Sequence, residues 1–162
     1  MKLSNKIEID ILAFFKFGKF DYLKVGQTKE WILNNFPDPD DIGMGDTLRN
    51  SKIWFYGNIE LHFEEDELSL IFSDNIIDLD GGEFLVLNKW ILDDQSKLKL
   101  SCFIEKLNDE RIDYTKKTEK LDLEYVRLTI TGSNVQLTFI DEENKLSDPN
   151  EFRLSAFSLA RH

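Results

Sequence analysis

The stretch Ile53-Trp54-Phe55-Tyr56-Gly57-Asn58-Ile59-Glu60-Leu61-His62-Phe63-Glu64 decides the fold. On both sides of its central Gly-Asn pair the side chains alternate with a period of two, and such a pair is a favoured hairpin turn. After the turn, three apolar residues alternate with polar neighbours, as in a strand with one buried face. The sequence therefore predicts a half-buried antiparallel hairpin over residues 53–64, followed by another strand over 68–72.

A second stretch, Ser133-Asn134-Val135-Gln136-Leu137-Thr138-Phe139-Ile140, repeats the turn residue and the apolar phase of the first. A helix is predicted before each hairpin. The first covers residues 29–36, with Thr28 as its N-cap, Pro37 as its stop and Trp31, Ile32 and Phe36 as its packing residues. The second covers 95–108, with Asp94 as its cap and apolar residues at helical spacing.

These segments predict a helix-strand-strand-strand unit written twice. The alternative is coincidence, because any two antiparallel hairpins share alternation and turn residues. The fold class is α+β, with one or two antiparallel sheets, helices on one face and an open opposite face. The chain is expected to form a single domain over residues 1–162, with two similar halves at about 1–92 and 93–162 if the repeat is real.

The remaining elements follow from the same patterns. A helix is predicted over residues 5–17, although Ile7, Ile9 and Ile11 also alternate as a strand would. Residues 37–50 and the Lys- and Thr-rich connection before residue 121 are predicted loops. A strand over 121–130 changes its apolar phase midway, which suggests a bulge. The last strand is expected over 152–159.

Composition limits the class of protein. With 162 residues and 41% hydrophobic content, the chain can bury a sizeable core without a metal or cofactor. The single Cys102 excludes an internal disulfide and favours a reducing compartment. Lys6, Glu8 and Asp10 interrupt the N-terminal apolar residues, and no stretch approaches the roughly 18 apolar residues of a membrane span. A cytoplasmic protein with no membrane partner is expected.

Charge is distributed unevenly along the chain. Residues 37–83 hold thirteen acidic and two basic side chains, and therefore the whole net charge of −11. Nucleic-acid binding is disfavoured because it depends on Lys and Arg neutralising phosphates. One interpretation is that a charged exterior simply keeps the protein in solution. The other is that a one-sign surface steers a basic protein partner.

The segment Val25-Gly26-Gln27-Thr28-Lys29-Glu30-Trp31-Ile32-Leu33-Asn34-Asn35-Phe36-Pro37-Asp38, with the Tyr56-Gly57 hairpin, resembles a recurrent bacterial module. That module has a glycine-x-threonine helix start, a proline-aspartate stop and a tyrosine-glycine hairpin. It is found, tandemly repeated, in beta-lactamase-inhibitory protein and in small outer-membrane assembly lipoproteins. The chain also looks like the immunity proteins encoded beside polymorphic toxins. The resemblance covers about residues 23–74.

The sequence departs from the periplasmic and secreted members of that group. It has no lipid-accepting cysteine near its start and no disulfide cysteines, and the glycine that ends the helix in those modules is Asn35 or Phe36 here. Of the members of that group, a cytoplasmic immunity-type protein agrees best with these departures. The resemblance then implies that the chain binds and neutralises a protein partner, a toxin effector domain.

Candidate catalytic and metal-binding groups are few. Cys102 with His62 or His162 would supply a nucleophile and a base, but Cys102 adjoins the apolar face of a predicted helix and is expected to be a small packing residue. Glu60, His62 and Glu64 lie two apart on a strand, roughly 6 to 7 Å from one another, which is wide for one tetrahedral ion. The expectation is a non-enzymatic protein without metal or cofactor.

The leading hypothesis is an immunity protein that blocks a basic toxin such as a nuclease, with its acidic side chains taking the place of substrate phosphates. Aromatic residues, including Phe55, would anchor the interface, because binding energy concentrates in buried aromatic side chains. The alternatives are a small protein that binds an apolar ligand in a Phe-lined cavity and an enzyme of unfamiliar type. The predicted partner-binding residues are Asp38, Asp40, Asp41, Asp46, Trp54, Tyr56, Glu60, His62, Glu64, Glu65 and Asp66.

Overall fold

The computed structural model describes residues 6–120, 122–145 and 148–161. Within these ranges the chain forms three α-helices, two short 3-10 helices and ten strands. Their order is β1 (Ile7–Asp10), α1 (Ile11–Phe17), α2 (Lys29–Asn35), β2 (Asp41–Gly43), β3 (Ile53–Tyr56), β4 (Ile59–Glu64), β5 (Glu67–Ser73), β6 (Leu85–Asn88), η1 (Gln95–Lys97), α3 (Leu100–Asp109), β7 (Tyr114–Lys120), β8 (Glu124–Ile130), β9 (Gln136–Ile140), η2 (Pro149–Glu151) and β10 (Arg153–Ala160).

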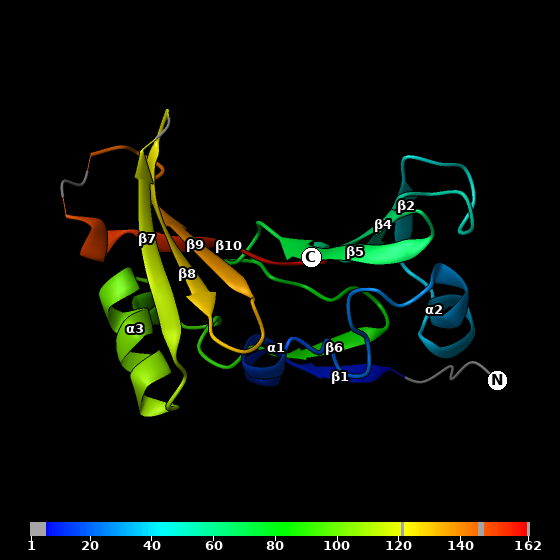
Figure 1. The fold of residues 1–162 in the computed structure, drawn as a ribbon, viewed down its shortest axis with the longest axis horizontal. Coiled ribbons are helices and arrows are strands. Elements are labelled where there is room, and N and C mark those ends of the chain that lie inside the picture. The colour runs from blue at the N-terminus through cyan, green and yellow to red at the C-terminus, as the bar shows by residue number, and fades with distance from the viewer. Residues whose placement is uncertain (1–5, 121, 146–147, 162) are drawn as a thin grey trace.

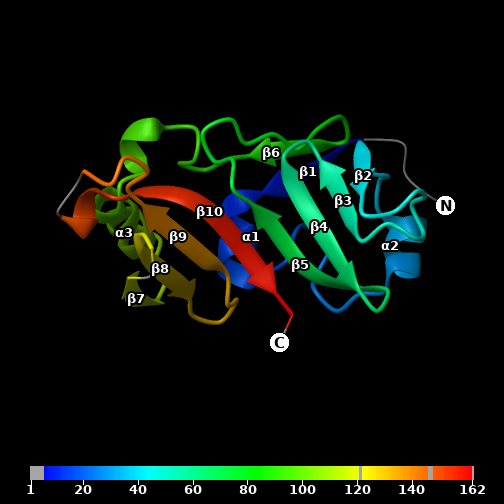
Figure 2. The same cartoon turned by 90° about the horizontal axis from the view of Figure 1, so that it is seen from above.

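Eight strands form one antiparallel sheet in the order β2-β3-β4-β5-β10-β9-β8-β7 (Figure 2). The order consists of two four-stranded runs, each in chain order, that meet where β5 pairs with β10. Helix α2 precedes the first run and α3 precedes the second. The predicted α+β class and both hairpins are confirmed. Each run has four strands rather than three, because residues 41–43 and 114–120 also join the sheet as β2 and β7.

One face of the sheet is buried and the other is open. Cross-strand neighbours such as Trp54, Leu61, Ile71 and Leu159 lie in one row across four strands, and all are buried. The three α-helices and the parallel β1–β6 ladder lie on that side, and no element covers the opposite side in the described part of the chain (Figure 1). This arrangement confirms the prediction of helices on one face.

Helix α1 packs beneath the junction of the two runs. The rings of Phe14 and Phe15 each contact the ring of Phe157 on β10 at a centroid distance of 5.7 Å. The hydroxyl of Ser133, in the β8–β9 turn, donates to the carbonyl of Phe15 at 2.7 Å. Gly18 ends the helix with a positive φ of 71°, a conformation that glycine adopts without steric cost. The helix therefore ties the second hairpin to the centre of the core.

The predicted helix over residues 5–17 is wrong in its first half. Residue 5 lies outside the described residues, and Ile7–Asp10 form β1, which pairs in parallel with β6. The Asp10 side chain then accepts from the amide of Ala13 at 3.2 Å and starts α1. Aspartate is a strong N-cap, so Asp10 marked the true start of the helix in the sequence. The helical spacing of Ile7 and Ile11 hid this signal and extended the predicted helix too far toward the N-terminus.

The predicted helix over 95–108 is interrupted. Asp94 caps only the 3-10 turn η1, where its carboxylate accepts from the amide of Ser96 at 3.0 Å. The next residues pair with the start of β10: the amide of Leu154 donates to the carbonyl of Leu98, and that of Leu100 donates to Phe152. Because these backbone groups bond across to another segment, α3 begins only at Leu100.

The Lys- and Thr-rich connection, predicted as a loop, is strand β7, which pairs with β8 along seven residues. The predicted strand over 121–130 begins at Glu124, and residue 121 lies outside the described residues. No bulge interrupts β8: its pairing with both neighbours is regular. The register shifts occur instead between His62 and Phe63 on β4 and between Leu154 and Ala156 on β10. None of the helices in the described ranges has the length and apolar character needed to span a lipid bilayer.

Tyr56 on β3 joins the sheet to the segment that follows α2. Its ring is fully buried and lies 5.6 Å from the ring of Phe36, and its hydroxyl donates to the carbonyl of Pro37 at 2.6 Å. Burial, reinforced by the charges of Asp38 and Asp40, raises the pKa of Tyr56 well above its ordinary value. The neutral phenol is therefore the form that the folded protein holds.

We expect the Tyr56→Phe substitution to lower the free energy of unfolding at pH 7 by about 1 kcal/mol, because it leaves the Pro37 carbonyl unpaired. Above a pH of about 10, unfolded Tyr56 loses its proton and folded Tyr56 keeps it, so wild-type stability falls by up to about 1.4 kcal/mol per pH unit from this residue. The variant lacks that contribution. The free energy of unfolding, measured with urea between pH 7 and 11, tests this prediction, and Tyr114→Phe is the control. If the free energy of unfolding fell equally steeply with pH in the wild type and in both variants, the prediction would be wrong.

Lys29, the first residue of α2, is buried to 5% exposure. Its ammonium donates to the carbonyls of Arg49 at 2.9 Å and Ser51 at 2.7 Å, and it lies 4.9 Å from the ring centroid of Phe63. Burial lowers the pKa of Lys29, and the nearby carboxylate of Asp66 opposes this shift. The lysine therefore fastens the loop between β2 and β3 onto both α2 and β4.

Replacement of Lys29 by Met keeps the apolar stem but leaves both carbonyls without their donor. We expect a loss of about 1–3 kcal/mol in the free energy of unfolding, measured by urea denaturation. Lys24→Met, at an exposed lysine, is the matched control and should change stability by less than about 0.5 kcal/mol. If the two variants were equally stable, the proposed fastening role of Lys29 would be wrong.

Candidate partner-binding surfaces

The open face of the first run carries six half-buried side chains from three adjacent strands, which we call the open-face strip. In one row, Ile53 lies opposite His62, and His62 lies opposite Leu70. In the next row, Phe55, Glu60 and Phe72 follow one another in the same way. Directly opposed residues of antiparallel strands share a face, so these six form one continuous surface. Its members are Ile53, Phe55, Glu60, His62, Leu70 and Phe72.

Acidic side chains lie along the border of this strip. Asp41 on β2 lies opposite Phe55, and Glu64 is the next outward residue on β4 after His62; both are exposed. Glu67 lies opposite Glu64, but it is paired with the guanidinium of Arg161. The strip is therefore an apolar and aromatic centre beside exposed carboxylates, of which Asp41 accepts from the Ile42 amide, an arrangement typical of protein-binding surfaces.

Within the strip, Nε2 of His62 lies 3.3 Å from Oε1 of Glu60. Both side chains are partly buried, at 31% and 21% exposure. The contact holds the imidazole and the carboxylate side by side on β4, with the apolar side chains of β3 and β5 on either side. Glu60 and His62, two of the predicted site residues, are thus brought together on the open face.

Trp54 and Tyr56, predicted as partner anchors, are in the core instead, at 1% and 0% exposure. The indole amide of Trp54 donates to the Ser51 hydroxyl at 3.0 Å and to the Leu48 carbonyl at 3.1 Å, so its polar group is also satisfied internally. The side chains on both faces of β3 are apolar, so the alternating pattern could not show which face points into the core. Phe55, between them, is the aromatic residue that faces outward.

The Asp40 side chain is bound within the protein and has a structural role. Its two carboxylate oxygens accept from the amides of Gly57 at 2.7 Å and Glu83 at 3.0 Å. Gly57 has a positive φ of 59°, and a Cβ there would lie 2.3 Å from the carbonyl oxygen of Asp80. The carboxylate therefore clamps the β3–β4 turn onto residues 80–83, where no larger turn residue fits.

The other predicted acids lie around the ends of the strands. Glu65 and Asp66 form the β4–β5 turn with positive φ angles of 52° and 60°. Asp66 also accepts from the amide of Lys29 through its backbone carbonyl at 2.8 Å, and its carboxylate lies 3.8 Å from that lysine's ammonium. Asp38 and Asp46 are exposed in the segment around β2. The acids therefore lie near both ends of β4: Asp40 and Asp41 near the β3–β4 turn, and Glu64, Glu65 and Asp66 at the β4–β5 turn.

The open face of the second run is closer to neutral. Lys117 lies opposite Arg127, and Glu119 lies opposite Tyr125. Glu119 pairs with the Lys117 ammonium and accepts from the Tyr125 hydroxyl, and these contacts lower the pKa of Glu119. The Arg127 guanidinium lies 5.2 Å from the Tyr125 ring centroid, and its buried Nε has no hydrogen-bond partner among the described residues. Lys117, Glu119 and Tyr125 thus satisfy one another, whereas Arg127 contacts only the face of the Tyr125 ring in this group.

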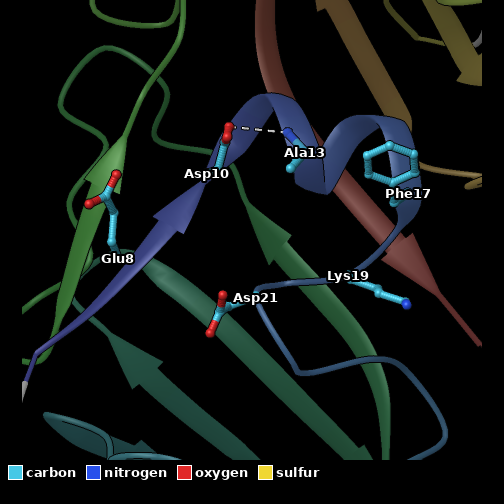
Figure 3. A pocket seen from close by; sticks show the side chains of 6 residues that line it. All are labelled: Glu8, Asp10, Ala13, Phe17, Lys19 and Asp21. Atoms are coloured by element: carbon cyan, nitrogen blue, oxygen red, sulfur yellow. Dashed lines mark hydrogen bonds between the residues drawn. The ribbon is translucent and has the colours of Figure 1, made fainter.

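Sequence reasoning missed a hollow on the covered side of the sheet (Figure 3). It has a volume of about 460 Å³ and is lined by Glu8, Asp10, Ala13, Phe17, Lys19 and Asp21. Phe17 is 68% exposed at the end of α1. The signal that was missed is Phe17, a large aromatic residue at the C-terminal end of a short helix. It lies close to the acids Glu8 on β1 and Asp21 in the loop after α1.

The candidate catalytic groups are not assembled. Cys102 is half-buried on α3, on the covered side, whereas His62 belongs to the open face, and His162 lies outside the described residues. Among the described side chains, no three His, Cys, Asp or Glu residues are grouped so as to hold a metal ion.

Comparisons with protein families, with curated proteins and with solved structures found no match to this chain.

Proposed function

We propose that this protein binds a basic protein partner on the open-face strip and blocks it. The observation that supports the proposal best is the coincidence of four half-buried apolar side chains with exposed carboxylates on an uncovered sheet face. Ile53, Phe55, Leu70 and Phe72 would lose their remaining water contact on binding, which is favourable. The carboxylates at Asp41 and Glu64 would speed the approach of a basic surface and fix its orientation.

The most concrete form of this function is an immunity protein that occupies the basic active-site cleft of a toxin such as a nuclease. In that form, the carboxylates would take the positions of substrate phosphates, and Phe55 and Phe72 would supply the desolvated centre. The proposal rests on the resemblance of residues 23–74 to immunity-type modules and on the charge of residues 37–83. It would act without catalysis by this chain, in the cytoplasm where a self-protecting cell needs it.

The alternative of an apolar-ligand carrier has weaker support. The aromatic side chains of the core contact one another, as Phe14 does with Phe20 at a centroid distance of 5.4 Å. A hollow of about 380 Å³ is lined by the apolar side chains of Leu98, Ile140 and Leu154, but Lys99, Glu143 and Arg153 also line it. Charged linings of this kind suit a polar or protein partner better than a wholly apolar ligand.

The test starts with capture of the partner from the source organism by the tagged full chain. Two double variants separate the contributions. In Asp41→Lys/Glu64→Lys, reversed charge should slow association about 10-fold or more at low salt, with little effect at high salt. In Phe55→Ala/Phe72→Ala, lost contact should speed dissociation by about 30-fold, which corresponds to roughly 2 kcal/mol. Surface plasmon resonance measures both rates, and thermal melting confirms that the variants fold.

The matched control is Glu105→Lys/Glu142→Lys, which changes the net charge equally at exposed acids of the second half. If this control slowed association as much as the Asp41 and Glu64 changes, bulk charge rather than the strip would govern binding. Recovery of no basic partner, or of one whose binding ignores all these variants, would remove the proposal. If a captured nuclease remained active in the complex, the blocking role would be wrong although the binding role stood.

A further inference from the structure

A groove lined by aromatic side chains runs along the covered side of the molecule. Three aromatic residues are exposed in the described part of the chain: Phe17 at 68%, Tyr22 at 37% and Trp31 at 39%. Phe17 lines the hollow of Figure 3, and Tyr22 and Trp31 line a second hollow of about 600 Å³. Lys19 and Asp21 border both hollows, so the two hollows adjoin, and we refer to them together as the groove.

The second hollow also corrects the expectation that Trp31 packs α2 into the core. Helix α2 has only seven residues, and its buried positions are Lys29 and Ile32. The Trp31 ring instead lies beside Tyr22 at a centroid distance of 6.1 Å, with an interplanar angle of 76°. Exposed Trp and Tyr in contact are the residue types in which binding energy concentrates.

The aromatic wall is held in place by the protein itself. Phe20 and Leu23 exchange backbone hydrogen bonds of 2.8 and 3.0 Å, which closes a tight turn with Asp21 and Tyr22 at its tip. The Tyr22 hydroxyl donates to the carbonyl of Asn35 at 2.5 Å, and the Asn35 amide donates to the carbonyl of Trp31 at 2.8 Å. Since these bonds fix the wall before any ligand arrives, binding would carry little ordering cost.

The two hollows differ in charge. In Figure 3 the carboxylates of Glu8, Asp10 and Asp21 lie on one side of the first hollow, with Lys19 and the Phe17 ring on the other. Asp10 accepts from the Ala13 amide through one oxygen, whereas Glu8 and Asp21 form no ion pair with any described residue. A cation near an aromatic face is attracted to it, and carboxylates add to that attraction. The first hollow therefore complements a Lys or Arg side chain.

We propose that this groove is a second binding site, for an extended basic segment of another protein that places a Lys or Arg in the first hollow. An apolar side chain of the same segment would lie against Tyr22 and Trp31 in the second hollow. The elements that form the groove are β1, α1, α2 and the loop between the helices, all on the covered side of the sheet (Figure 1). The groove and the open-face strip can therefore be occupied at once.

The probe is a random peptide library displayed on phage and selected on the immobilised full chain. Enriched peptides should combine Lys or Arg with a nearby apolar residue. The synthesised winner should bind about 10-fold more weakly to Phe17→Ala and to Asp21→Asn, measured by the change in tryptophan fluorescence. Ile77→Ala, at an apolar side chain 62% exposed outside the groove, is the matched control and should leave affinity unchanged. Because Phe17 and Asp21 are both exposed, thermal melting should confirm that both variants fold.

Other results would overturn the site. Enrichment of acidic peptides or of none, or equal loss of affinity in Ile77→Ala, would contradict it. Loss of peptide binding in Asp41→Lys/Glu64→Lys but not in the groove variants would assign the peptides to the open-face strip, and would leave the proposed function standing. A dimer in sedimentation equilibrium that Phe17→Ala dissociates would mean that a second copy of the chain covers the groove. If only the partner experiment failed, the groove would still stand.

Discussion

The antiparallel pairing of β5 with β10 is the constraint on which the rest of the structure depends. Residues 70–73 pair with 157–160, and this ladder joins two four-stranded runs into one sheet. The register of this pairing places buried residues opposite buried residues: Ile71 lies opposite Leu159 on the buried side, and Phe72 lies opposite Ser158 on the open side. A slip of one residue would turn every apolar side chain of one run toward solvent. Register at the junction thus fixes both the core and the open face.

Sequence patterns predicted the parts of the fold in which one face alone is apolar. Ile59, Leu61 and Phe63 alternate with polar residues, and β4 was predicted correctly. Strand β7 was missed because no apolar alternation marks it: five of its seven residues are exposed, and its conformation depends on the edge that β8 offers. The pairing of β1 with β6 was missed because the partner of Ile7 lies 78 residues away, so the alternation of Ile7 and Ile9 could not be told from a helix by local pattern.

The candidate site was predictable only in part. Alternation shows that Phe55 and its neighbours face opposite sides, but both phases of β3 are apolar, so the choice between them is made by the partner strands. The role of Asp40 depends on Gly57 and Glu83, which only the fold brings to it. The groove was beyond reach of local patterns because Glu8, Phe17, Asp21 and Trp31 come from four separate segments.

Particular contacts also reduce the cost in stability of the uneven charge of the chain. A surface with thirteen acids in one segment repels itself, and that repulsion would favour unfolding. Several of these acids are engaged: Glu67 with Arg161, Glu60 with His62, Asp66 with Lys29, and Asp40 with two backbone amides. Asp41 and Glu64 form no ion pair with a described residue, and they border the apolar strip. Because repulsion between exposed carboxylates is relieved when a cationic surface approaches, a basic partner that contacted Asp41 and Glu64 would lower the repulsion within this segment.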